Sequence, residues 1–502
     1  MSALVARQTP ARLLPALGIA ALGAAAVPLA VAVGEVSPKV LLAGLVAAAG
    51  LAALALAGHL KHALLFCFVV ALTYNRQFYS FDWLHGDLGG RGLYWCPSDV
   101  FLLGLLILWP LERAVARATG RPLAPSRTGP STAVWLLPLI AAAILSSLIG
   151  SEEPIGSLTE VYRYGKIAVL LVYLRHNLDR RTSLVAVAAL GGVILMQAPI
   201  SVLQVAFASG QNGLTQIFQT SEPSELARRA AGTLGHPNFL APYLLLIVPP
   251  FAALGLGLWR TRLGYLCALL AGAGALTIVL SQSRAPIVLV SLAVVAIVGI
   301  LTQRRLMPPL RAVALTVAAA TLLVLATIPL LGVIEKRLVG DLGASVDFRA
   351  GYNEAAIRMW EKSPVLGVGP NNFAAEIRHF AADRYVLMTL DALSTDQARD
   401  KVHLRSVAPV HNVYLLIASE QGFLGLCAFL LFLGRAVLLS WRASRRAPAV
   451  EGLFATGVLC GLLAEAAQQQ LDYSMMWDPL LSTLALLVAL CQSIAAQREA
   501  RP

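Results

Sequence analysis

Basic side chains stand close to the start of three of the long apolar segments of this chain. Arg228 and Arg229 precede one segment, Arg284 opens a second, and His411 precedes a third. The N-terminus of a helix offers unpaired N–H groups and a partial positive charge, which suit a phosphate. A guanidinium group recognises phosphate oxygens. If the three segments begin on one side of a membrane, these residues predict an anion site there.

Each of these residues also has a structural interpretation. His236 and Asn238 flank Pro237 at the start of the first segment, where they suit helix capping and hydrogen bonds between helices. Arg284 can instead extend to lipid headgroups. Glu420 lies nine residues after His411. At about 100° per residue it falls on the opposite helix face, so we do not pair it with the histidine.

The composition places most of the chain in a membrane. Of its 502 residues, 58% are hydrophobic and 13% are charged, and the mean hydropathy is +0.72. Soluble proteins have about 45–50% apolar and about 25% charged residues. The apolar residues, about 290 in number, suffice for about fourteen helices of about 20 residues each. A soluble enzyme, a coiled coil and a disordered chain are therefore excluded.

Apolar runs bounded by polar or Pro/Gly-rich stretches predict the membrane spans. Their approximate ranges are 13–33, 39–58, 60–74, 98–111, 132–150, 161–176, 183–208, 238–258, 263–281, 285–302, 310–334, 422–441, 450–468 and 478–496. The predicted fold class is all-α, a polytopic membrane protein with about 12–14 transmembrane helices. One long polar loop, at about 335–410, interrupts the apolar pattern.

The net charge of +12 has a simple explanation in such a protein. Lys and Arg accumulate in cytoplasmic loops, and placing both termini in the cytoplasm puts most of the arginines there. The expected partner is therefore the lipid bilayer, and no nucleic acid is expected. Some basic residues remain on the outer side against this rule, and we take them as functional candidates: Arg163, Lys166, Arg228, Arg229, Arg284 and Arg349.

The long loop has an organisation of its own. Asp347 is predicted to cap a helix that ends at Glu361 or Lys362, with Arg349 early in it. The sequence 367–372, GVGPNN, predicts a turn that is either a weak phosphate-loop signal or part of a packed cap. The chain has no HExxH, GxSxG, CxxC or DxD pattern and no nucleotide fingerprint. No metal site and no cofactor are predicted.

Four stretches resemble the O-antigen ligase and O-antigen polymerase superfamily of bacterial inner-membrane glycan transferases. They are RAAGTLGHPN at 229–238, SQSRAP at 281–286, FRAGYNEAAIRMWEKSPVLGVGPNNF at 348–373 and HNVYLLIASEQGFLG at 411–425. The resemblance implies a GT-C-like membrane fold. It also implies a core at 228–440 that includes the loop 335–410, between N-terminal helices at 1–227 and C-terminal helices at 441–502.

The resemblance further implies a reaction at the periplasmic face of the inner membrane. A glycan would move from undecaprenyl diphosphate to an acceptor hydroxyl, with inversion and without a metal. Arg229 and Arg284 would hold the diphosphate, and His411 would deprotonate or orient the acceptor. Arg228, which stands beside Arg229 and could replace it, would be a further substrate contact. The other expected contacts are His236, Asn238, Arg349 and Tyr414.

Several functions remain open at this point. A ligase would transfer finished polymer to lipid A–core, whereas an O-antigen or exopolysaccharide polymerase would join it to a second lipid-linked glycan. A transporter or flippase of lipid-linked glycans would need polar groups near the bilayer midplane, where this sequence is apolar. A non-catalytic assembly protein is a further alternative.

Overall fold

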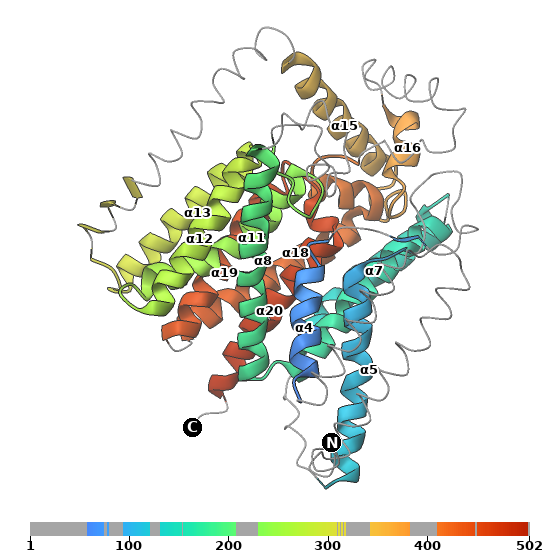
Figure 1. The fold of residues 1–502 in the computed structure, drawn as a ribbon. Helices are drawn as coiled ribbons and strands as arrows, with labels where there is room; N and C mark the ends of the chain where they lie inside the picture. The colour runs from blue at the N-terminus through green and yellow to red at the C-terminus, as the bar shows by residue number, and fades with distance from the viewer. Residues whose placement is uncertain are drawn as a thin grey trace. The chain divides into compact units, whose positions relative to one another are not determined.

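A computed structural model describes residues 58–74, 78–79, 94–120, 131–152, 154–206, 229–308, 342–381, 409–446 and 449–499, with six further positions between 310 and 317. The described chain is almost entirely helical, which confirms the predicted all-α class (Figure 1). Two short strands, β1 (Phe78–Tyr79) and β2 (Tyr94–Trp95), pair antiparallel with Phe78 opposite Trp95.

Most of the described helices follow the apolar runs of the sequence. In chain order the described helices are α4 (Leu60–Ala71), α5 (Pro97–Ala118), η2 (Thr132–Leu136), α6 (Leu137–Leu145), η3 (Ser146–Gly150), α7 (Pro154–Asn177), α8 (Arg180–Ala206), α11 (Pro237–Gly257), α12 (Arg262–Leu280), α13 (Arg284–Gln303), α15 (Leu342–Lys362), α16 (Phe373–Phe380), α18 (Val413–Arg446), α19 (Ala449–Gln468), η5 (Ser474–Met476) and α20 (Asp478–Glu499). Of these, α15 and α16 lie in the polar segment at 335–410.

Eight of the helical segments in the described part are long and apolar enough to cross a membrane. Three predicted runs, at 13–33, 39–58 and 310–334, lie wholly or mostly outside the described residues. Two predicted helix starts need comment. The span expected from 422 follows a break at Gly422, as the sequence indicated, but a further helical stretch from Val413, capped by Asn412, precedes the break and belongs to the same element, α18. The helix expected to start after Asp347 begins at Leu342.

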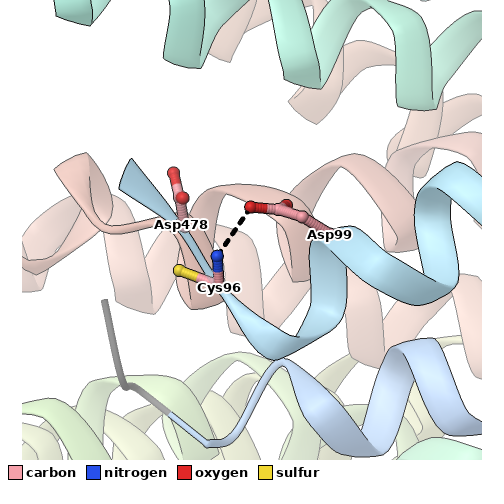
Figure 2. A group of neighbouring side chains, drawn as sticks. All are labelled: Cys96, Asp99 and Asp478. Carbon is pink, nitrogen blue, oxygen red and sulfur yellow. Dashed lines mark hydrogen bonds between the residues drawn. The ribbon is translucent and has the colours of Figure 1, made fainter. Parts of the chain in front are cut away.

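The described residues form two compact units, and the first contains α4, α5 and the first turns of α8. Leu64, Leu65 and Phe68 of α4 are buried, and Leu64 packs beside Gly104 of α5. The start of α5 is fixed locally, since the Cys96 backbone N–H donates to Asp99 Oδ2 at 2.8 Å (Figure 2). This bond satisfies an N–H group at the helix end, where no backbone partner exists.

The second unit contains the remaining helices, and α11 is its core. Residues 240–254 of α11 are buried throughout, and this helix packs against α12, α13 and α19 (Figure 1). Close approach depends on small residues, because a Cβ at Gly457 of α19 would come within 2.3 Å of Pro250 Cα. Helices in a membrane associate through such close backbone contacts.

A kink in α18 receives the turn that joins α15 to α16. Gly422 has φ 63° and ψ −164°, so the helical hydrogen bonding is broken there. The Val368 and Gly369 N–H groups donate to the carbonyls of Ser419 and Glu420 at 2.9 and 2.8 Å, and Phe423 N–H donates to Pro364 O at 2.8 Å. The turn therefore docks on α18 through its backbone.

Candidate active site

Arg229 joins the start of α11 to the turn between α12 and α13. Its Nε donates to the carbonyl oxygen of Ser281 at 2.9 Å, and Nη2 donates to Asn238 Oδ1 at 2.9 Å. The Ser283 hydroxyl donates to the same oxygen of Asn238 at 2.9 Å. The starts of α11 and α13 therefore lie together, and Asn238 forms the inter-helix hydrogen bonds that its position suggested.

His236 caps α11 through one ring nitrogen, which leaves the other ring nitrogen as a neutral hydrogen-bond donor. Its Nδ1 accepts the backbone N–H of Asn238 at 3.1 Å, and Pro237 occupies the first helical turn. Burial lowers the pKa of His236 to about 4, and the positive charges of Arg229 and His411 act in the same direction. Because Nδ1 is the acceptor, the neutral ring carries its proton on Nε2.

His411 has the opposite arrangement of its two ring nitrogens. Its Nδ1 lies 3.2 Å from the carbonyl oxygen of Pro409, which can only accept, so Nδ1 carries the proton. The lone pair of the neutral ring is then on Nε2. Burial lowers the pKa of His411, and the charge of Arg349 lowers it further, against the smaller effect of the Pro409 carbonyl. A T-shaped contact with Tyr473, at 5.4 Å between ring centroids, orients the imidazole.

Arg349 and Asp472 complete this group of charges. Arg349 lies on an exposed position of α15 and acts electrostatically on both His411 and Asp472. Asp472 is buried in the loop between α19 and α20, and its carboxylate accepts the Tyr473 N–H at 2.8 Å. Burial raises the pKa of Asp472 to about 6, although Arg349 and the Tyr473 N–H oppose this shift.

The remaining predicted site residues differ in where they lie. Arg284 is the first residue of α13, and its side chain is exposed and forms no hydrogen bond or ion pair with any residue that the structure describes. Tyr414 donates its hydroxyl to the Ala466 carbonyl at 2.8 Å, which fixes α18 against α19. Arg228 lies outside the described residues.

Two basic residues that opposed the insertion rule have structural partners instead. Arg163 forms an ion pair with Glu160 one turn earlier in α7. Lys166 pairs with Asp478 at the start of α20, at 2.5 Å, and both side chains are buried. Buried charges need such partners, so the packing of α7 already explains these two residues.

Sequence reasoning missed the contributions of Ser283, Asp472 and Tyr473. Asp472 belongs to no motif, and its electrostatic relation to Arg349 links positions far apart in the chain. Tyr473 gave no motif at all. Ser283 stands in SQSRAP beside Arg284, so the motif itself could have indicated it.

Residues 266–430 match the family described as O-antigen ligase. This range extends from α12 to the part of α18 that follows the kink, and it includes Arg284, Arg349, His411 and Tyr414. The match confirms the resemblance found in the sequence. Among curated proteins, no match to the chain was found.

Proposed function

Taking the chain as a multi-pass membrane enzyme of the O-antigen ligase or polymerase type, we propose that it transfers a glycan from undecaprenyl diphosphate to an acceptor sugar hydroxyl. The site lies at the periplasmic face of the bacterial inner membrane, with both termini in the cytoplasm. The reaction is inverting and uses no metal ion. Arg229 and Arg284 bind the diphosphate, and His411 is the general base.

The observation that carries this proposal is the opposed hydrogen bonding of the two histidines. His411 donates from Nδ1 to Pro409, which leaves a basic Nε2, and His236 accepts at Nδ1, which leaves a donor at Nε2–H. Besides burial, the charges of Arg229 and His411 both lower the pKa of His236. A proton acceptor, a proton donor and an arginine suit the transfer of a sugar away from a phosphate.

The chemical step follows from this arrangement. His411 Nε2 takes the proton of the acceptor hydroxyl, and the acceptor oxygen forms a bond to the anomeric carbon of the donor. The bond from that carbon to the phosphate oxygen breaks, and undecaprenyl diphosphate leaves with the electron pair. Arginine and the helix N-termini stabilise the charge that develops on the leaving group, so it needs no proton. The proton on His411 then passes to water.

His236 and Arg349 support this step from two sides. The Nε2–H of His236 is a neutral donor suited to a phosphate or sugar oxygen, and Asn238 holds Arg229 in place. Burial keeps the pKa of His411 low, and the charge of Arg349 adds to this effect, which maintains the basic form at neutral pH. As an exposed guanidinium, Arg349 is also suited to bind an anionic substrate. Arg228 and Tyr414 remain candidate contacts of the glycan.

A deletion strain complemented with variants tests the proposal. His411→Ala is expected to abolish the surface glycan that the wild-type gene restores, because the base is lost. His379→Ala is the matched control, since His379 is an exposed histidine of α16. Normal glycan with His411→Ala, or loss of glycan with His379→Ala at equal protein amounts, would contradict the role of His411.

The same strain separates the two possible acceptors. A ligase uses lipid A–core, so its deletion leaves lipid-linked polymer that does not reach lipid A. A polymerase uses a second lipid-linked glycan, so its deletion leaves single repeat units. Gel analysis of lipid A-linked and lipid-linked glycans distinguishes the two outcomes.

A further inference from the structure

Two buried glutamines of α8 hold the turn that carries Arg229 and His236. Gln204 Oε1 accepts the backbone N–H groups of Ala231 and Gly232 at 3.0 and 2.8 Å. Its Nε2 donates to the carbonyl oxygen of Gly232 at 3.1 Å. One side chain thus forms three hydrogen bonds with two consecutive residues, two positions after Arg229.

Gln197 binds the next residue of the turn, almost two helical turns earlier in α8. Its Oε1 accepts the Thr233 N–H at 3.0 Å, and its Nε2 donates to Thr233 Oγ1 at 2.5 Å. The Thr233 hydroxyl in turn donates to the Thr73 carbonyl at 2.9 Å. We call the side chains of Gln197 and Gln204 the glutamine clamp.

The turn is shaped to fit this clamp. Gly232 has φ 57°, a left-handed conformation that favours glycine, and a Cβ there would lie 2.2 Å from Gln197 Oε1. On the other side of the turn, Ala230 N–H donates to Leu280 O at 2.9 Å, one residue before the carbonyl that holds Arg229. The turn is therefore fixed between α8 and the end of α12.

The energetic cost of the clamp points to a purpose other than packing. Gln197 and Gln204 are 0% and 4% exposed and belong to a helix apolar enough to span a membrane. Polar amides are costly in such a place unless they are hydrogen bonded, and apolar side chains would pack there without this requirement. Both amide groups form their hydrogen bonds with residues 231–233, and this turn carries Arg229, the residue proposed to bind the diphosphate.

We propose that Gln197 and Gln204 are positioning residues, which fix the Arg229–His236 turn so that Arg229 and His236 face the diphosphate group of the donor. The inference rests on the proposed function. It extends the functional unit to α8, which lies outside the family match at 266–430. Small displacements of a binding group have large effects on a transfer reaction, so the clamp controls rate through geometry.

The test compares three substitutions in α8 of the full-length protein. Gln204→Leu removes all three bonds at nearly constant volume. Gln204→Glu is the conservative rescue, because a protonated carboxyl group can still accept through one oxygen and donate to Gly232 O through the other. Ser201→Ala is the matched control, since Ser201 is fully buried in the same helix and its Oγ has no hydrogen-bond partner in the described structure.

The first readout is hydrogen exchange of the peptide that contains residues 231–233 in purified protein. Gln204→Leu is expected to speed exchange there, with other helices unchanged, while Gln204→Glu and Ser201→Ala keep the wild-type rate. The second readout is the affinity for inorganic pyrophosphate, the probe of the diphosphate site. Gln204→Leu is expected to weaken it about tenfold, because the arginine is no longer held in place. Gln204→Glu should restore most of the affinity.

The outcomes separate the inference from the function on which it rests. Unchanged exchange at 231–233 with Gln204→Leu would overturn the clamp, as would equal pyrophosphate affinity in Gln204→Leu and the wild type when exchange is faster. Slower or faster exchange throughout the protein would also overturn it, since that is a purely structural effect. Arg229→Gln is measured in parallel for glycan transfer, and wild-type transfer by this variant would contradict the proposed function while leaving the exchange result intact.

Discussion

The two histidines at the site show how local hydrogen bonds can give identical side chains opposite chemistry. His236 accepts a backbone N–H at Nδ1 and so caps α11, whereas His411 donates from Nδ1 to the Pro409 carbonyl. Burial is the largest cause of the low pKa of each ring. At neutral pH both are uncharged, so one presents N–H and the other a lone pair.

The low pKa of His411 predicts the pH dependence of glycan transfer. The active form of a base is the neutral one, and the pKa lies below the ordinary value of 6.5. The acidic decline of transfer should therefore be centred below pH 6.5. The rate is measured from the release of undecaprenyl diphosphate across the pH range. A decline centred above pH 6.5 would be inconsistent with His411 as the base.

Asp472 provides the control for this profile, because its pKa of about 6 lies in the same range. In Asp472→Asn the acidic decline should persist, or move to lower pH, since a negative charge near Arg349 is removed. Disappearance of the decline would assign it to Asp472.

Arg229 is expected to tolerate no replacement by lysine. Its guanidinium donates from Nε to Ser281 and from Nη2 to Asn238, whereas a lysine ammonium is a single compact group. We expect Arg229→Lys to reduce transfer about tenfold or more, since two charge-assisted bonds to neighbouring helices are lost. Arg358→Lys is the control, because Arg358 is exposed on α15 and pairs with Glu354. Full activity of Arg229→Lys in the complemented strain would refute this role.

At the level of helices and turns, the sequence predicted most of what is local. Apolar runs located the described helices, and Pro237 and the Ser363-Pro364 pair marked a helix start and a helix end correctly. The docking of the 363–372 turn on α18 was not predictable in the same way. It depends on backbone bonds between Val368 and Ser419, and between Gly369 and Glu420, and no periodicity records such pairs. The GVGPNN turn uses these N–H groups for packing, so a phosphate is not needed to explain it.

The docked turn predicts that Gly422 cannot be replaced. A residue with φ 63° and ψ −164° is in a region restricted to glycine, and a Cβ there would lie 2.2 Å from the Val365 carbonyl carbon. Gly422→Ala should lower stability by about 1–3 kcal/mol from backbone strain alone, with the overlap adding to this. Thermal unfolding of the purified protein measures the effect.

Gly434→Ala is the matched control in the same helix. A Cβ at Gly434 would meet no atom within 4 Å, and alanine favours the helix by about 1 kcal/mol. Its unfolding temperature should equal or exceed that of the wild type. A Gly422→Ala protein as stable as Gly434→Ala would show that the turn does not depend on the kink.

Across the second unit as a whole, the site and the arginine-rich loops occupy opposite ends of the helices. α11 and α13 begin at the site and have 21 and 20 residues, or about 30 Å each, which is the thickness of a bilayer core. At the far ends, Arg304 donates to the Ser444 carbonyl at 2.8 Å, and Arg311 lies 4.1 Å over the Trp259 ring. Tryptophan is enriched at both membrane interfaces, whereas Lys and Arg accumulate in cytoplasmic loops, so these arginines agree with the proposed orientation.

The placement of the site and the arginine-rich loops at opposite helix ends predicts which introduced cysteines a reagent can reach from each side of the membrane. Arg358→Cys on α15 should react with a thiol reagent that reaches the periplasm but does not cross the inner membrane. Arg262→Cys, at the start of α12, should react only after the inner membrane is opened, because α12 leads from there to the site. Both positions are exposed, so access alone decides the outcome. The native protein measures the background from its own cysteines. The reverse pattern would place the site in the cytoplasm.

The sequence predicted which basic residues of the candidate site stand at helix starts. It did not predict which side chains these residues contact. Arg229, Arg284 and His411 were recognisable because each stands at the start of an apolar run. The same reasoning included Arg163 and Lys166, whose acids are an i,i+3 neighbour and a distant residue of α20. The position of a basic residue along a span shows that it departs from the insertion rule. Only the tertiary structure shows whether an ion pair with a carboxylate accounts for that basic residue.

Purified protein in liposomes offers the most direct measurement of glycan transfer. The protein is supplied with a glycan on undecaprenyl diphosphate and with an acceptor glycolipid, and free undecaprenyl diphosphate and extended acceptor are quantified together. The wild type should release one undecaprenyl diphosphate for each glycan transferred, His379→Ala should do the same, and His411→Ala should release none. Transfer at the wild-type rate by His411→Ala, or no transfer by the wild type with either acceptor, would contradict the proposed function.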